Sequence, residues 1–303
     1  MELVCSTNNS IEDVNSGNMG ILLMGSINLS ESDKQIWMEI QEILDPKEEV
    51  RKLPEQEITK LTIDSCETLP EKCIPKDISS DNIEFKIVTE DMVEEAIEFL
   101  WENFYPDEPV RRSLEGGRGL LLDRFTKLYI GKGWSIAALD QTGKIIGLRV
   151  GKIVTPDDQF ETAMAKESVK RVLCMISNIT NAYNSLQTYF LRRERLGYSV
   201  LGFMEKNDAK RVYVGNGVCT ASNYRGKGLA TQLVAKSIEV AKNEGCDYVY
   251  VCVSGNYSSK LFDRLGFTVE SELRYDEFVD ESGQPLIKDT REHVKAQVRS
   301  KKI

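Results

Sequence analysis

The sequence is poor in the side chains that build metal sites and disulfide frameworks. Its 303 residues include one histidine, His293, and seven cysteines that form no C-x-x-C pair. A structural zinc ion takes several such ligands at close spacing, so we expect no metal site. An odd number of cysteines in a long chain without a recognisable secretory signal argues against a disulfide framework. It favours a reducing, cytoplasmic compartment.

Long apolar runs are also lacking. The most apolar stretch near the start, Met19 to Leu29, is interrupted by two glycines, a serine and an asparagine. It is too short for a transmembrane helix, which needs about 20 apolar residues. We therefore expect no membrane association.

Positive charge is scarce in the first part of the chain. The net charge is -9, and the residues up to Glu84 hold 18 acidic and 7 basic side chains. The remainder holds 30 acidic and 32 basic side chains. The acidity therefore belongs to the N-terminal segment, and the nearly neutral body does not have the charge of a nucleic-acid binder.

Aromatic residues are nearly absent from residues 1–82, where Trp37 is the single example. A segment with so little to bury is predicted to be an acidic, mostly disordered extension. One short amphipathic helix is expected within it: Ser30 offers an N-cap, Pro46 ends the pattern, and apolar residues follow helical spacing. These are Ile36, Trp37, Ile40, Ile43 and Leu44. The helix either docks on the body, meets a protein partner or forms only transiently.

Strand and helix patterns alternate from residue 83 to the end. Strands are predicted at 85–88, 134–139, 145–154, 211–220, 246–254, 267–279 and 293–298. Helices are predicted from Thr89 to Phe104 and at 120–129, 161–193, 229–244 and 258–265. This order predicts a single α/β (mixed α+β) domain at 83–303, with helices on the faces of a central sheet.

A glycine-rich loop joins one of these strands to a helix: Arg225, Gly226, Lys227, Gly228, Leu229 and Ala230. Free N–H groups at a helix start suit a phosphate, and glycines allow close approach. The P-loop pattern fails because Gly228 follows Lys227, and the dinucleotide pattern fails because Thr231 stands at its third glycine. The glycines alone leave open a turn that binds nothing; with the two cations they indicate a pyrophosphate site.

This loop resembles the R/Q-x-x-G-x-G/A motif of the GNAT superfamily of acyl-CoA N-acyltransferases, and Asn256 with the later Leu265-Gly266-Phe267 resembles the next motif. The resemblance implies a mixed, mostly antiparallel sheet flanked by helices, with acetyl-CoA as cosubstrate. In that family the strand before the loop splays from its neighbour, and the pantetheine arm lies beside it. The residues implied to bind the cofactor are Val218, Cys219, Thr220, Arg225, Gly226, Lys227, Gly228, Leu229, Ala230, Thr231 and Asn256.

A narrower likeness covers the acceptor side. Residues 104–110, Phe-Tyr-Pro-Asp-Glu-Pro-Val, resemble a block of the arthropod-type arylalkylamine (dopamine) N-acetyltransferases, as do 252–258 and parts of 292–298. The likeness implies that Glu108 is the general base that takes the proton of the amine. It makes Ser254 and Ser258 candidates for the general acid. Aromatic side chains would suit an arylalkylamine pocket, formed by Phe104, Tyr105 and Tyr257.

Three points stay open on the sequence. Phe262 stands where many GNAT enzymes have a tyrosine that protonates the departing thiolate, so the acid is unassigned. Ser254 and Ser258 could equally cap a helix. Cys219 is better explained as a buried strand residue than as a nucleophile, because free cysteines are mostly inert.

The function expected is an N-acetyltransferase of a small primary amine, by direct attack. Agmatine, a polyamine or a protein lysine is the alternative acceptor. A catalytically silent module that binds acyl-CoA or a protein is the alternative class.

Overall fold

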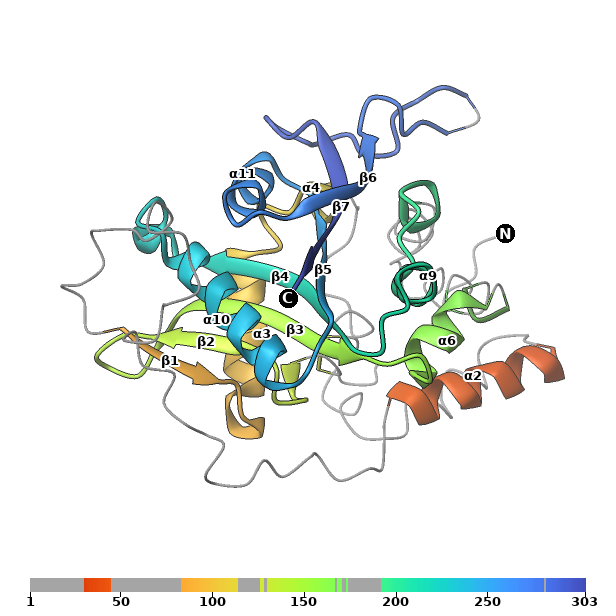
Figure 1. Cartoon of the computed structure of the whole chain (residues 1–303). Coiled ribbons are helices and arrows are strands. Elements are labelled where there is room, and N and C mark those ends of the chain that lie inside the picture. The colour runs from red at the N-terminus through yellow and green to blue at the C-terminus, as the bar shows by residue number, and fades with distance from the viewer. Residues whose placement is uncertain are drawn as a thin grey trace, which may run out of the picture.

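The computed structural model describes residues 30–44, 83–113, 126–127, 130–166, 168–170, 173, 192–280 and 282–303. Seven strands form one twisted sheet in the order β1-β2-β3-β4-β5-β7-β6 (Figure 1). The strands are β1 (Glu84–Ile87), β2 (Ile136–Leu139), β3 (Ile145–Val154), β4 (Val212–Thr220), β5 (Tyr248–Val253), β6 (Thr268–Arg274) and β7 (Lys295–Lys302). The α-helices are α2 (Glu31–Leu44), α3 (Val93–Asn103), α4 (Pro109–Arg112), α6 (Gln159–Ala165), α9 (Val200–Asn207), α10 (Leu229–Asn243) and α11 (Asn256–Arg264). Short 3₁₀ turns occupy η4 (Glu90–Met92) and η5 (Ser222–Tyr224).

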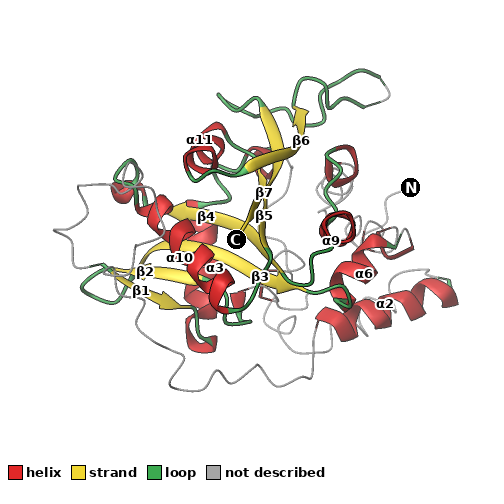
Figure 2. Cartoon of the chain, in the orientation of Figure 1, coloured by secondary structure: helices red, strands yellow, loops and turns green. Residues whose placement is uncertain are grey.

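The centre of the sheet is covered on both faces, and this makes β3 buried along its whole length. Leu148 and Val150 pack with the apolar side of α3, whereas Ile146 packs with Leu229 and Leu233 of α10. Figure 2 shows these helices against the strands. The predicted mixed, mostly antiparallel sheet with flanking helices is confirmed.

One strand pair differs from the others. β4 and β5 are parallel and pair only from Val212 with Tyr248 to Gly215 with Val251, whereas every other neighbouring pair is antiparallel. On its other side β4 stays paired with β3 as far as Thr220. The register places Gly217 opposite Val150 and Gly215 opposite Gly151, which leaves Asn216 as the extra residue of a β-bulge. The strand therefore bends where it leaves β5.

Several expected elements are confirmed with shifted ends. The hairpin of β2 and β3 forms, and its turn contains Gly143 with φ of +84°. Helix α11 begins at Asn256 instead of residue 258, and β7 runs to Lys302 instead of residue 298. Pro109 occupies the first turn of α4, where a missing N–H does no harm.

Two expectations need correction. A single helix over 161–193 is wrong, because α6 ends at Ala165 and Lys166 takes an extended conformation with ψ of 129°. Helix α9 was not anticipated, although Ser199 accepts a hydrogen bond from the Gly202 N–H at 3.1 Å and caps it. Most of the helix expected at 120–129, and the stretch 174–191, lie outside the described residues.

The short helix expected in the acidic extension is present as α2. The Asp33 N–H donates to Ser30 Oγ at 3.2 Å, as an N-cap requires. Trp37 and Ile40 are 1% and 4% exposed, and α2 packs against α6. Of the alternatives left open by the sequence, docking on the body is the one observed. The disorder predicted for the rest of residues 1–82 falls outside the described residues, and the boundary at 82/83 stays a prediction.

Within the described ranges, no helix combines the length and apolar character needed to cross a membrane.

Trp37→Ala should release α2 from the body, because it removes a large side chain buried at that contact. The expected loss is about 3 kcal/mol of docking free energy. Hydrogen exchange of the amides of 31–44 should then approach the rate of an unprotected helix. Met38→Ala is the matched control, since Met38 is 43% exposed. Equal protection in both variants would contradict the docking role of Trp37.

Candidate active site

The site begins at the edge of β4 that β5 leaves uncovered. In the part of the chain that the structure describes, residues 216–220 have no strand on this side, and residues 217–220 pair with β3 on the other. Five residues give an edge of roughly 16 Å, with backbone N–H and C=O groups that an extended ligand can pair with. Val218, Cys219 and Thr220, expected to bind the cofactor arm, lie on this edge. The splay that the resemblance implies is therefore present.

The glycine-rich loop lies at the outer end of the same edge. Gly226 and Gly228 have φ values of +76° and +89°, a left-handed backbone that glycine adopts without strain. Gly228 is the N-cap of α10, and no atom lies within 4 Å of a Cβ built on Gly226. The first N–H groups of a helix have no intrahelical acceptor, so this turn can donate to an anion. Its geometry fits a pyrophosphate.

The Arg225 side chain forms hydrogen bonds with three other residues. Its guanidinium donates to Asp107 at 2.7 Å, to the Asn103 carbonyl at 3.2 Å and to the Thr220 carbonyl at 3.4 Å. Asp107 also pairs with Arg291 at 2.9 Å. These exposed ion pairs contribute little stability, but they fix the segment before Glu108 beside the glycine-rich loop. Arg225 thus joins the segment before α4 to the glycine-rich loop.

Glu108 is the N-cap of α4 and is not a freely solvated acid. Its side chain is half-buried and accepts from the Arg111 N–H at 2.5 Å. Burial and then the nearby Glu108 charge raise the pKa of Tyr275. Burial raises the pKa of Cys252 on β5, where Arg192 opposes the rise and Glu108 adds to it. The carboxylate is therefore close enough to Tyr275 and to Cys252 of β5 to act on both groups electrostatically.

Ser254 and Ser258 do not cap α11, because its N-cap is Gly255 without a side-chain bond. The Ser254 carbonyl accepts from the Tyr275 hydroxyl at 2.5 Å, and Ser258 Oγ donates to the Gly255 carbonyl at 2.9 Å. Ser254 is thus brought close to Tyr275 and so to the neighbourhood of Glu108. No pattern in the sequence pointed to Tyr275, which lies far along the chain from Glu108.

Asn256 and Tyr257 lie in the first turn of α11. The Asn256 amide donates to the Glu292 carbonyl at 2.5 Å and accepts from the Val294 N–H at 3.4 Å, so it ties α11 to the segment before β7. Tyr257 is 68% exposed and contacts His293 edge-on. The structure therefore gives Asn256 a bracing contact and leaves Tyr257 outside any enclosed wall.

Phe104 and Tyr105 do form an aromatic surface. The Phe104 ring lies 3.6 Å from the position of a Cβ on Gly217, at the bulge of β4. Tyr105 packs on Trp101 with ring centroids 4.6 Å apart, and its hydroxyl lies 3.1 Å from Thr126 Oγ1. These rings cover the α3 side of the sheet where the strands separate.

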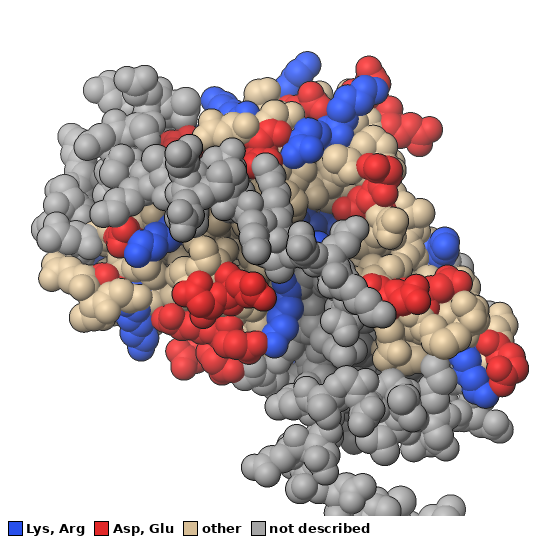
Figure 3. All heavy atoms as spheres, turned by 90° about the horizontal axis from the view of Figure 1, so that it is seen from below, with Lys and Arg blue, Asp and Glu red and all other residues tan. Residues whose placement is uncertain are grey.

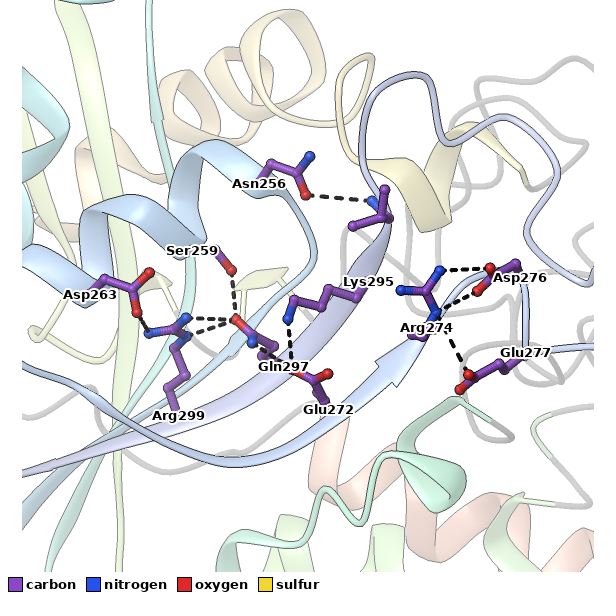
Figure 4. Close-up of polar contacts among 11 residues, drawn as sticks. Asn256, Ser259, Asp263, Glu272, Arg274, Asp276, Glu277, Lys295, Gln297 and Arg299 are labelled. Carbon is purple, nitrogen blue, oxygen red and sulfur yellow. Dashed lines mark hydrogen bonds and ion pairs between the residues drawn. The ribbon is translucent and has the colours of Figure 1, made fainter.

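Phe262 is fixed inside the core. It is 2% exposed and packs edge-on to Phe267 at 4.8 Å. Helix α11 is clamped to β7 by Ser259 with Gln297 at 2.6 Å and by Asp263 with Arg299 at 2.5 Å (Figure 4). The position expected to carry a hydroxyl donor thus holds a rigid apolar ring.

Cys219 is protected from reaction. Burial raises the pKa of its thiol to about 12, against an opposing effect of Arg225. His293, the single histidine, accepts from the Asn256 N–H at 3.2 Å through Nδ1 and braces the start of α11. Among the described residues no group of three metal-ligating side chains comes together.

We expect Cys219→Ala to keep turnover within a few-fold of the wild type, because a thiol with this pKa is about one part in ten thousand thiolate at pH 8. Alkylation of Cys219 should accelerate about tenfold for each unit of pH without levelling off below pH 10, since a raised pKa moves ionisation upward. Peptide mapping after iodoacetamide treatment measures the rate of Cys219 alkylation at each pH. Loss of all turnover in Cys219→Ala, with normal folding, would instead indicate an acyl-enzyme.

The fold and the splayed strand are of the GNAT type. The model of the Acetyltransferase (GNAT) family matches residues 181–267. Arylalkylamine N-acetyltransferase 2 from Aedes aegypti is 22% identical with a TM-score of 0.64, over 74% of this chain and 100% of that chain. Drosophila melanogaster polyamine N-acetyltransferase, which forms N-acetylagmatine, is 20% identical with a TM-score of 0.61, over 73% of this chain and 100% of that chain. At these identities the likeness establishes the fold.

Proposed function

We propose that this protein is an N-acetyltransferase that transfers the acetyl group of acetyl-CoA to a small primary amine. The observation that carries the proposal is the free edge of β4, which runs from the separation of β4 and β5 to a loop with two left-handed glycines at the start of α10. This arrangement offers backbone groups to an extended arm and helix N–H groups to a pyrophosphate. The match of residues 181–267 to the acetyltransferase family supports it.

The proposed reaction is a direct attack within a ternary complex. An amine is protonated at neutral pH, and Glu108 accepts the proton directly or through a water molecule. The amine nitrogen then attacks the thioester carbon. A backbone N–H on the free edge near Val218 donates to the oxyanion that develops. Glu108 suits the role because its carboxylate is held at the start of α4 by the Arg111 N–H.

An arylalkylamine is the acceptor that the site supports best. Phe104 and Tyr105 provide aromatic surface at the bulge, and such surfaces bind rings and cations. A structural relative acts on arylalkylamines.

Agmatine or a polyamine is the second candidate acceptor. Helix α3 exposes Glu94, Glu95, Glu98 and Glu102, and acidic side chains gather on the face of the molecule seen in Figure 3. An acidic face favours the approach of a cationic acceptor.

The experiment that tests the function is thiol release from acetyl-CoA over a panel of amines, with calorimetry of acetyl-CoA binding alongside. We expect the highest kcat/KM with an arylalkylamine such as tyramine. A preference for agmatine or spermidine would move the assignment to the second acceptor. Binding without thiol release for any amine or lysine peptide would indicate a silent module, and absence of binding would reject the proposal.

Glu108→Gln should lower kcat by about 10²-fold or more, because the base is lost while an oxygen remains to cap α4. Its affinity for acetyl-CoA should stay within twofold of the wild type. Asp107→Asn is the matched control in the same segment: it breaks the pair with Arg225 and should change acetyl-CoA binding more than the pH profile. An unaltered kcat in Glu108→Gln would remove Glu108 from the role of base.

A further inference from the structure

A buried arginine lies where β4 and β5 separate. Arg149 of β3 is 1% exposed and is among the largest fully buried side chains. Its Nε donates to Ser237 Oγ at 3.4 Å, and its Nη1 donates to the Gly217 carbonyl at 3.3 Å. In the described part of the chain its Nη2 is buried without a hydrogen-bond partner. The Tyr213 hydroxyl interacts with the guanidinium, but no acceptor among the described residues meets Nη2 in hydrogen-bonding geometry, and a buried donor of this kind calls for one.

Three other buried cations among the described residues have acidic partners. Lys152 pairs with Glu161 at 2.8 Å, and Arg299 pairs with Asp263 at 2.5 Å. Lys236 pairs with Glu239 at 2.9 Å. Among the described residues Arg149 pairs with no carboxylate and instead faces the rings of Tyr213 and Phe262, at 6.0 and 5.7 Å from their centroids. Because an unpaired buried charge is unfavourable, this arrangement indicates a ligand with an electron-rich group.

The guanidinium occupies the inner end of the free edge of β4. A Cβ on Gly215 would lie 1.8 Å from Nη2, so the glycine makes room for the arginine. Gly215 is the last residue of β4 that pairs with β5. Ser237 and Phe262 place the group on the side of α10 and α11, the side on which the glycine-rich loop starts α10. An arm held by its pyrophosphate at that loop, and lying along the edge, ends at Arg149.

We propose that Arg149 stabilises the thiolate that departs from acetyl-CoA, in place of the hydroxyl that Phe262 lacks. The inference rests on the proposed function. The amine nitrogen forms a bond to the acyl carbon, the carbon–sulfur bond breaks, and its electron pair stays on sulfur. Nη2 donates a hydrogen bond to that sulfur. The nitrogen loses two protons, one before the attack and one as the amide forms, and Glu108 accepts each in turn after passing the first to solvent. An arginine keeps its own proton, so the thiolate takes its proton from solvent after release.

The test measures the ionisation of bound coenzyme A. The ultraviolet absorbance of the thiolate is recorded against pH for the protein with bound CoA. The same curve for the protein with desulfo-CoA is subtracted, which removes the absorbance of the protein's own thiols. In the wild type the pKa of the bound thiol should fall by about one to two units below its free value of roughly 8.5, because the cation favours the charged form. In Arg149→Gln the shift should vanish. The kcat should fall about 10²-fold, while KM for acetyl-CoA changes less than threefold.

Three further variants separate this role from support of the fold. Arg299→Gln is the matched control, a buried arginine with its own acid partner, and it should leave the bound thiol pKa unchanged. Gly215→Ala should displace the guanidinium and reduce the shift, even if Arg149→Gln does not fold. Phe262→Tyr in the Arg149→Gln background should restore part of kcat, since it returns a hydroxyl.

An equal bound-thiol pKa in the wild type, Arg149→Gln and Gly215→Ala would overturn the inference while the proposed function stands. The inference would also be overturned if Arg149→Gln lowered kcat only for acyl-CoAs that carry a carboxylate on the acyl group, since the arginine would then recognise the acyl chain. If wild-type protein does not bind CoA, the proposed function fails, and the inference fails with it.

Discussion

The limited pairing of β4 with β5 is the constraint on which the rest of the site depends. The two parallel strands share only four residue pairs before the bulge at Asn216 turns β4 away. If the ladder continued, the backbone groups of residues 216–220 would be satisfied within the sheet and no ligand could use them. The helices keep the strands apart: α10 packs beneath β3 and β4, and α11 is held to β7 by its polar contacts.

The two glycines that flank the bulge let different side chains approach the same short piece of strand. Gly215 accommodates the guanidinium of Arg149 on the side of α10, and Gly217 accommodates the ring of Phe104 on the side of α3. The bulge thus has a cation on one face and an aromatic surface on the other. This is a physical basis for a cofactor that enters from one side and an acceptor that enters from the other, with Glu108 beside the gap.

The cofactor loop and the acceptor segment are also connected directly. Asp107 bridges Arg225 and Arg291, so one carboxylate links the end of β4, the segment before α4 and the segment before β7. Glu108 is the next residue. The position of Glu108 therefore depends on the same contacts that hold the glycine-rich loop, and three distant parts of the sequence meet here.

The sequence by itself determined the elements whose signals are local. Apolar runs and alternating apolar residues predicted β1 to β5. Glycines marked the ends of α10, and the helical spacing of Trp37 and Ile40 predicted α2. The glycine-rich loop was recognisable because phosphate binding by a helix start is a local property. Only the tertiary structure decided that Arg149 is buried without an acid, that Tyr275 meets Ser254 and lies near Glu108, and that Asn256 and Arg225 are already engaged. These contacts join residues up to 122 positions apart, and no periodicity within a short window encodes which distant strand will lie beside which.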